Sequence, residues 1–261
     1  LDVAKWLYEI KPTIDISVEN EFAFRWSCSN GHLDVAKWLY EIKPTIDISV
    51  VNEIVFRWSC RHGHLEVAKW LYEIKPAINI SADNEEAFRM SCENGHLEVV
   101  KWLYEIKPTI DISADNEGAF RLSCYYGHLD IAKWLYQIKP TIDISACNEF
   151  AFMLSCENGH LEVAKWLYEI KPTININIIN WNEDVFSLCC KNGHLEVAKW
   201  LYQIKPTINN DNEFAFILSC QNGHLDLAKW LYQVKPTINI SANREWAFRL
   251  SCENGHLEVV K

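Results

Sequence analysis

A repeat of about 32 residues runs through the whole sequence. Eight glycines, each followed by histidine, are separated by 32, 32, 32, 32, 34, 30 and 32 residues: Gly31, Gly63, Gly95, Gly127, Gly159, Gly193, Gly223 and Gly255. All eight prolines recur with nearly the same period. A period of this size is typical of solenoids, in which each unit packs on its sequence neighbours. We therefore predict a single array over residues 1–261, with about eight repeats of 30–34 residues and a truncated repeat at both ends.

The charge balance and the absence of apolar runs argue against two classes of partner. The chain has 25 Lys and Arg against 35 Asp and Glu, a net charge of −10. This charge repels a phosphate backbone, so we predict no nucleic-acid partner. No apolar run approaches the roughly 20 residues of a membrane span, and the first residues do not resemble a signal peptide. We predict a soluble, intracellular, cytoplasmic protein without a membrane partner.

Eight of the ten cysteines occupy one position in successive repeats: Cys28, Cys60, Cys92, Cys124, Cys156, Cys190, Cys220 and Cys252. Equivalent sites on packed helices lie about 8 to 10 Å apart. A disulfide requires Cα atoms within roughly 7 Å of each other. We therefore expect reduced, buried side chains at this position.

Residues 20–51 show the pattern of one repeat. Asn20 is a suitable N-cap for a first helix of about ten residues, and Gly31 can adopt the left-handed conformation that ends it. Small and apolar residues on this helix form a stripe that predicts a core face: Ala23, Phe24, Ser27 and Cys28. A second helix, HLDVAKWLYEI, ends before Pro44. The segment PTIDIS then predicts a short extended finger.

These residues resemble the ankyrin repeat over the whole chain. The resemblance rests on NGHLEVAKWLY, on the finger, and on a following helix that leads into S-C-x-N-G-H. It is strongest to the Trp- and Tyr-rich ankyrin arrays of large DNA viruses of protists, which would place the protein in the host cytoplasm. The resemblance implies an all-α, ankyrin-like solenoid of stacked helix-turn-helix repeats with short extended fingers. Where the family has T-P-L-H, the first repeat has F-A-F-R, so the Thr/His hydrogen bonds of the family must be replaced, with Asn20 and its equivalents as candidate caps.

Positions that vary between repeats cluster at the sites of Phe22, Arg25 and Ser29, spaced i, i+3 and i+7 on the first helix. The resemblance implies that this face and the fingers line a concave binding surface. Its first half is basic and its second half is apolar, a composition typical of interface cores. We expect Trp181, at the tip of a longer finger, to be partly exposed. The candidate partner-binding residues are Phe22, Arg25, Arg57, Arg89, Arg121, Phe150, Met153, Trp181, Phe214, Ile217 and Trp246.

Two of these patterns have a structural alternative. Each arginine could instead pair with the fixed glutamate beside it, as Glu21 with Arg25, and only decorate the surface. The eight tryptophans at the site of Trp38 could form a stacking platform for sugars or bases. Packing between second helices is the favoured interpretation, because each tryptophan lies in an apolar stripe that must be buried.

The sequence gives little support for catalysis, and we predict no enzyme and no cofactor. Cys28 and His32 are four residues apart, but Gly31 interrupts the helix between them. One Cys and one His in every repeat is a stacking pattern, whereas a nucleophile and its base form a single asymmetric site. The segment 60–64 holds three potential metal ligands, Cys60, His62 and His64. A zinc site needs a fourth ligand, so we predict no metal.

Taken together, these patterns predict a scaffold or adaptor whose partner is another protein, bound on the first-helix and finger surface. A structural spacer or elastic array without a specific partner is the alternative from a different class. The scaffold and the spacer hypotheses can be distinguished, because only a binding protein needs the residues of the variable face for its function.

Overall fold

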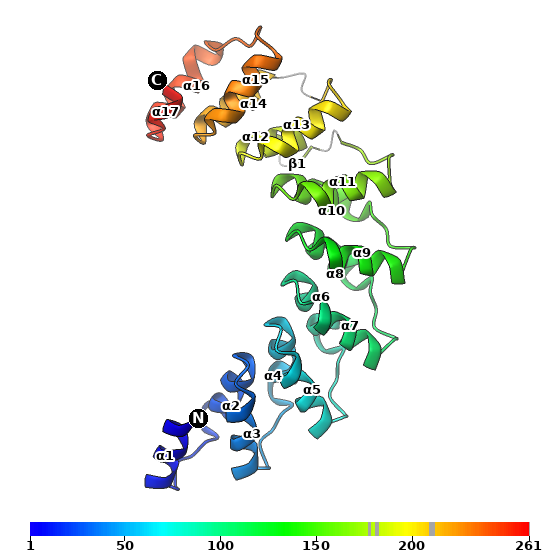
Figure 1. The fold of residues 1–261 in the computed structure, drawn as a ribbon, viewed down its shortest axis with the longest axis vertical. Helices are drawn as coiled ribbons and strands as arrows, with labels where there is room; N and C mark the ends of the chain where they lie inside the picture. Colours follow the sequence, from blue (N-terminus) through cyan, green and yellow to red (C-terminus); the bar gives the residue numbers. More distant parts are fainter. Residues whose placement is uncertain (177–178, 181–182, 209–211, 261) are drawn as a thin grey trace. The chain divides into compact units, whose positions relative to one another are not determined.

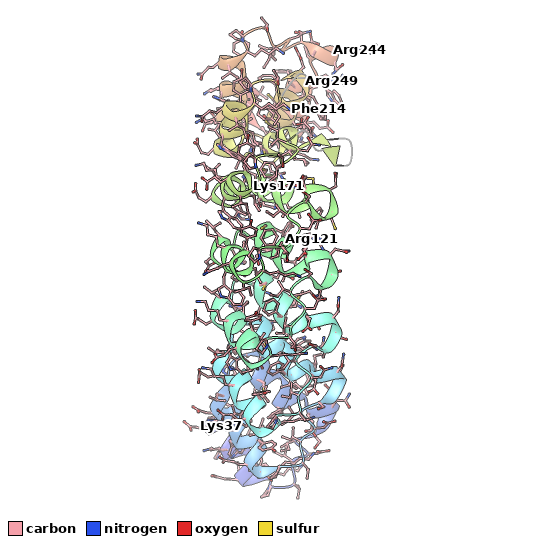
Figure 2. All side chains as sticks on the ribbon, turned by 90° about the vertical axis from the view of Figure 1, so that its right-hand side faces the viewer. Lys37, Arg121, Lys171, Phe214, Arg244 and Arg249 are labelled. Atoms are coloured by element: carbon pink, nitrogen blue, oxygen red, sulfur yellow. The ribbon has the colours of Figure 1, made fainter. Side chains whose placement is uncertain are left out.

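A computed structural model describes the chain except for residues 177–178, 181–182, 209–211 and 261. The chain divides into two compact units. Unit 1 comprises Leu1–Ser123 and Asp130–Pro140, and unit 2 comprises Cys124–Leu129 and Thr141–Lys261. Within each unit, antiparallel helix pairs follow one another along the chain and pack side by side (Figure 1). Side chains fill the space between successive pairs (Figure 2).

The repeats alternate between an A helix and a B helix. The A helices are α2 (Val18–Ser29), α4 (Val50–Arg61), α6 (Ala82–Glu93), α8 (Ala114–Tyr125), α10 (Ala146–Glu157), α12 (Val185–Lys191), α14 (Asn212–Gln221) and α16 (Ala242–Glu253). The B helices are α1 (Asp2–Ile10), α3 (Leu33–Ile42), α5 (Leu65–Ile74), α7 (Leu97–Ile106), α9 (Leu129–Ile138), α11 (Leu161–Ile170), α13 (Leu195–Ile204), α15 (Leu225–Val234) and α17 (Leu257–Val260). Two-residue strands β1 (Ile179–Asn180) and β2 (Glu183–Asp184) pair antiparallel in the longer finger. The all-α prediction is confirmed.

Aromatic rings link successive repeats within each unit. The Trp70 ring on α5 lies 6.1 Å from the buried Phe24 ring on α2 and 5.9 Å, edge to face, from Tyr40 on α3. The same Phe and Tyr contacts recur at Trp102, with 6.1 Å between centroids in both. Such T-shaped pairs stabilise beyond the area they bury. The interpretation of the tryptophans as packing residues is therefore confirmed.

A line of serine hydroxyls also joins neighbouring A helices. Ser91 Oγ donates to Ala87 O on its own helix at 2.7 Å, and it lies 3.1 Å from Cys60 O of the preceding repeat. Ser251 contacts Cys220 O in the same way at 2.9 Å. Cys189 takes the serine position in α12, and its Sγ lies 3.2 Å from Cys156 O. These contacts supply partners for buried polar groups without interrupting the apolar core.

The fingers and the starts of the A helices differ from the prediction. In the finger before α4, Ser49 N donates to Asp47 Oδ1 at 2.9 Å, an Asx turn rather than an extended strand. Val51, Asn52 and Glu53 then adopt left-handed φ angles of 50°, 54° and 62°. Six A helices begin with such a left-handed turn of three residues. The prediction of an asparagine cap is therefore wrong at five positions, because these residues lie inside the turn: Asn20, Asn52, Asn84, Asn116 and Asn148.

Contacts from side chains stabilise the left-handed turn, which costs about 1 to 2 kcal/mol per residue for side chains other than glycine. Ser49 Oγ donates to Glu53 Oε1 at 3.0 Å. Fixed lysines at the ends of the B helices reach the same glutamate position, as Lys43 to Glu21 at 3.3 Å and Lys171, labelled in Figure 2, to Glu149 at 3.5 Å. The recurring Ser, Glu and Lys therefore act together in holding the turn.

Every cysteine lies in the described part of the chain, and all ten are free thiols. Cys147 and Cys252 are exposed, whereas the other eight are buried. The prediction of a buried side chain is wrong for Cys252, which lies on α16 with no following repeat in this sequence to cover it. Among the described residues, no helix is long and apolar enough to cross a membrane.

Candidate protein-binding face

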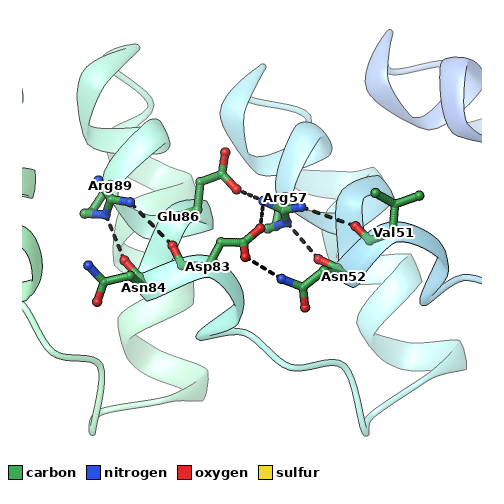
Figure 3. A network of polar contacts seen from close by, with 7 residues as sticks. All are labelled: Val51, Asn52, Arg57, Asp83, Asn84, Glu86 and Arg89. Atoms are coloured by element: carbon green, nitrogen blue, oxygen red, sulfur yellow. Dashed lines mark hydrogen bonds and ion pairs between the residues drawn. The ribbon is translucent and has the colours of Figure 1, made fainter.

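The row of arginines on the A helices bonds to the backbone of the left-handed turn. Arg57 donates from Nε to Asn52 O at 2.8 Å and from Nη2 to Val51 O at 3.3 Å (Figure 3). Arg121 donates to Asn116 O and Asp115 O in the same way, both at 2.7 Å. These carbonyls lie in a turn that a regular helix does not continue, so the guanidinium supplies their donors. These arginines are thus part of the structure of the repeats that carry them.

Carboxylates of the following repeat pair with the arginines. Arg57 Nη1 contacts both Asp83 and Glu86, which extend toward it from α6 (Figure 3). Arg89 Nη1 lies 3.2 Å from Asp115 Oδ2 on α8. The alternative that Arg25 pairs with Glu21 beside it is wrong, because Glu21 pairs with Lys43. The ion pairs of Arg57 and Arg89 therefore run between repeats, whereas Arg121 lies 4.0 Å from Asp115 of its own helix. The contacts of Arg57 leave it only 7% exposed.

The predicted apolar residues of this face fall into two groups. Phe22 and Trp246 are 45% and 41% exposed, and Phe150 and Phe214 are partly buried. Met153 and Ile217 are each only 3% exposed, so the prediction that they lie on an accessible face is wrong.

The burial of Ile217 has a clear packing reason. Its side chain belongs to a buried cluster with Cys220, Ala228 and Ala247. An arginine at this position must keep its charge near polar groups, whereas an apolar side chain gains free energy by leaving water. Trp181, which was expected to be partly exposed, lies outside the described residues.

Two tryptophans on the same face were missed by the sequence reasoning. Trp26 on α2 is 44% exposed, and its ring lies 5.6 Å from Phe22 and 6.1 Å from Trp58 on α4. The signal was present, because Phe22 and Trp26 are four residues apart and therefore share a helical face. The pattern i, i+3 and i+7 does not include the position i+4, where Trp26 stands.

The comparisons with known proteins decide the family. A model of ankyrin repeats (three copies) matches residues 26–116, 55–148, 88–180, 120–212 and 186–261. The chain belongs to the ankyrin repeat family. Its fold is also similar to the crystal structure of the human ASB11 ankyrin repeat domain, with a TM-score of 0.54 and 17% sequence identity over 70% of this chain and 83% of that one. A search of curated proteins gave no significant match.

One repeat begins its A helix with a side-chain cap, at the position where the ankyrin family has T-P-L-H. In α12 the segment Asp184-Val185-Phe186-Ser187 stands there, and Asp184 Oδ1 accepts from Ser187 N at 2.9 Å as a normal N-cap. The Ser187 hydroxyl donates to Asp184 Oδ2 at 2.9 Å. Six of the other ankyrin repeats use the left-handed turn instead. The described A helices therefore begin in two ways, with a capped start in α12 and a left-handed turn in six others.

The polar groups of this ankyrin array do not gather into a catalytic or metal centre in the part of the chain that the structure describes. Burial raises the pKa of the Cys60 thiol, while His62 Nδ1 lies 3.2 Å from Ser29 Oγ. No group of three His, Cys, Asp or Glu side chains among the described residues is placed to hold a metal ion. What the A-helix face offers is aromatic surface, guanidinium donors and carboxylates, which suit recognition of another protein.

Proposed function

We propose that this ankyrin array is a protein-interaction scaffold that acts by binding alone, without catalysis, cofactor or metal. Its partner is another protein, held on the A-helix face and the fingers. Residues 1–261 act as one array in this proposal. The family supports it, because ankyrin repeats generally bind proteins and are generally non-catalytic.

The proposal rests on one observation: residues on the accessible A-helix face differ in chemistry from repeat to repeat. Core positions such as Phe24 and Phe56 repeat almost unchanged and are fully buried. One position on the A-helix face changes in every repeat, and the residues there are Phe22, Ile54, Glu86, Gly118, Phe150, Asp184, Phe214 and Trp246. Large aromatic residues that remain exposed on a variable face are typical of interface anchors.

The structure refines which of the predicted residues we propose as contacts. Phe22, Phe150, Phe214 and Trp246 contact the partner directly, together with the solvent-accessible parts of Arg25, Arg89 and Arg121. Arg57, Met153 and Ile217 are buried and support this face from beneath. Trp181 remains a proposed contact.

Two further features belong to the proposal. An intracellular, cytoplasmic setting is supported by the ten free thiols, since reduced cysteines persist where disulfides do not form. The likeness to arrays of large DNA viruses of protists rests on the Trp- and Tyr-rich repeats. Knowledge of the source genome would test it directly.

The function is tested by affinity capture from a lysate of the native cell with three baits. The second bait carries Phe22→Ser, Phe150→Ser, Phe214→Ser and Trp246→Ser. The control bait carries Lys37→Ser and Lys101→Ser on the exposed faces of α3 and α7. All three must show equal helicity by circular dichroism. A partner kept by the first and control baits but lost by the second is the expected result, whereas identical partner lists would favour the structural spacer.

A further inference from the structure

Arg25 lacks the carboxylates that pair with other arginines of its row. Arg57 contacts Asp83 and Glu86, which lie 26 and 29 residues further along the chain. The positions with the same offsets from Arg25 hold Val51 and Ile54. Val51 and Ile54 have apolar side chains, whereas the next repeat has carboxylates at the equivalent positions. Val51 and Ile54 belong to α4, the A helix that follows α2. The lack of carboxylates near Arg25 therefore does not result from α2 being the first A helix.

The remaining contacts of Arg25 leave its charge unpaired. Its Nη2 donates to Glu19 O at 2.8 Å, a backbone contact. Its Nε is buried and has no hydrogen-bond partner, although Arg57, Arg89 and Arg121 all use Nε to bond to the turn. No described carboxylate lies within 4.0 Å of the guanidinium, that of Glu19 included. At Arg57 the carboxylates contact Nη1, so an incoming carboxylate at Nη1 of Arg25 would supply the pairing that this guanidinium lacks.

Two exposed aromatic residues lie near Arg25 in the sequence of α2. Phe22 lies three residues before Arg25, on the same helical face, and Trp26 follows Arg25 directly; they are 45% and 44% exposed. The Trp26 ring contacts Trp58 on α4, with 6.1 Å between centroids. Apolar neighbours lower the local dielectric constant and strengthen an ion pair formed among them.

Val51 is unfavourable in two respects. It is 55% exposed, and its φ of 50° is left-handed, which is highly strained for a β-branched residue. Asp83 and Asp115 hold the equivalent position with φ angles of 52° and 58°, a conformation that aspartate tolerates better. The turn itself recurs in six described A helices, so the structure enforces the conformation, and what distinguishes this position is the valine. An exposed valine here keeps the Arg25 charge free of an internal partner.

We propose that Phe22, Arg25, Trp26, Val51 and Trp58, which we name the Arg25 site, bind an Asp or Glu side chain of the protein partner flanked by large apolar residues. The partner carboxylate takes the place at Arg25 that Asp83 and Glu86 occupy at Arg57. This inference rests on the proposed scaffold function and names the chemistry of the partner segment. A single carboxylate in an apolar segment fits better than an acidic run, because the chain itself carries −10.

The test uses a displayed library of short linear peptides selected on the full chain. The affinity of each selected peptide is then measured by fluorescence polarisation on the natural chain and on three variants. Arg25→Gln removes the charge. Val51→Asp restores the internal carboxylate seen in the next two repeats. Thr109→Asp adds the same charge on an exposed finger residue and serves as the matched control.

The expected result is a set of peptides that share one Asp or Glu beside aromatic or aliphatic residues. Their affinity should fall at least about tenfold on Arg25→Gln and on Val51→Asp, and should stay unchanged on Thr109→Asp. The Val51→Asp variant excludes misfolding as the cause, because aspartate already occupies this position at Asp83 and Asp115.

Several outcomes would overturn the Arg25 site. They are peptides without an acidic residue, equal affinity for the natural chain and Val51→Asp, and no peptide enriched above background. Peptides that bind Arg25→Gln and Val51→Asp unchanged but lose affinity on Phe150→Ser with Phe214→Ser would overturn this site and leave the scaffold function standing. Failure of the scaffold itself would appear separately, as identical partner lists in the lysate capture.

Discussion

A Cβ atom placed on Gly31 would lie only 2.5 Å from Nδ1 of His64, one repeat further along the chain. The same close approach recurs between Gly63 and His96. Gly31 also has a φ of +75°, which side chains rarely adopt. Glycine is therefore required at this position for two reasons. The backbone of its own repeat has a positive φ, and the histidine imidazole of the next repeat leaves no room for a side chain.

Replacing Gly31 with alanine should destabilise unit 1 by more than about 1 kcal/mol, since both the positive φ and the contact with His64 oppose a side chain. Gly255→Ala is the matched control, because Gly255 has the same φ of +75° but nothing within 4 Å of the added carbon. Urea unfolding of both variants measures the two losses of free energy. Equal losses would mean that the approach of His64 contributes nothing.

The histidines of these turns should make stability depend on pH. Burial lowers the pKa of His64, His160 and His194 below the ordinary value of 6.5, despite the backbone hydrogen bonds that raise it. The unfolded chain therefore takes up protons first as the pH falls. The stability from neutral histidine is fully present above about pH 6.5 and is lost as the pH falls through the lower folded-state pKa.

Urea unfolding at about pH 7.5 and about pH 5.5 tests this, a range in which most carboxylates stay ionised. Titration of the imidazole protons by NMR provides the assignment to individual histidines. Stability that is equal at the two pH values, or imidazoles that titrate at or above 6.5, would contradict the prediction.

Two of the ten thiols should react rapidly in the folded protein. Cys147 and Cys252 are exposed, whereas burial raises the pKa of thiols such as Cys28 and Cys92, and that of Cys220 to about 12. Because the thiolate is the reactive form, the buried thiols should react only after unfolding. Ellman's reagent counts both classes, and Cys147→Ser with Cys252→Ser should remove the fast class. Fast reaction of any further thiol would show that the core opens.

Val51→Asn should stabilise the protein by about 1 kcal/mol, because asparagine tolerates the left-handed conformation that strains valine. Asn243 already occupies the equivalent position in α16. Val18→Asn is the control, since Val18 is also 55% exposed but has no positive φ. The free energy of unfolding from urea denaturation should rise only for Val51→Asn, and an equal change in the two variants would contradict strain as the cause.

The sequence by itself determined the period, the helix pairs, the family and the core stripe except at Ala23, which is exposed although its equivalents Val55 and Ala87 are buried. Each of these depends on local propensity and on apolar spacing within one repeat, and eight near-copies reinforce the same pattern. The packing of the tryptophans followed for the same reason, because an apolar stripe on a B helix must meet neighbours on both sides.

The tertiary structure decided how each A helix begins and which residues its face presents. Local propensity favours Asn20 as a cap, and three left-handed residues in succession are unfavourable by themselves. They form because Ser, Lys and Arg side chains satisfy the turn from neighbouring elements. The burial of Ile217 and the unpaired charge of Arg25 likewise depend on residues of another repeat, at Ala247 and at Val51 and Ile54. Contacts between repeats determine these features, because the free energy of each side chain depends on what the next repeat places beside it.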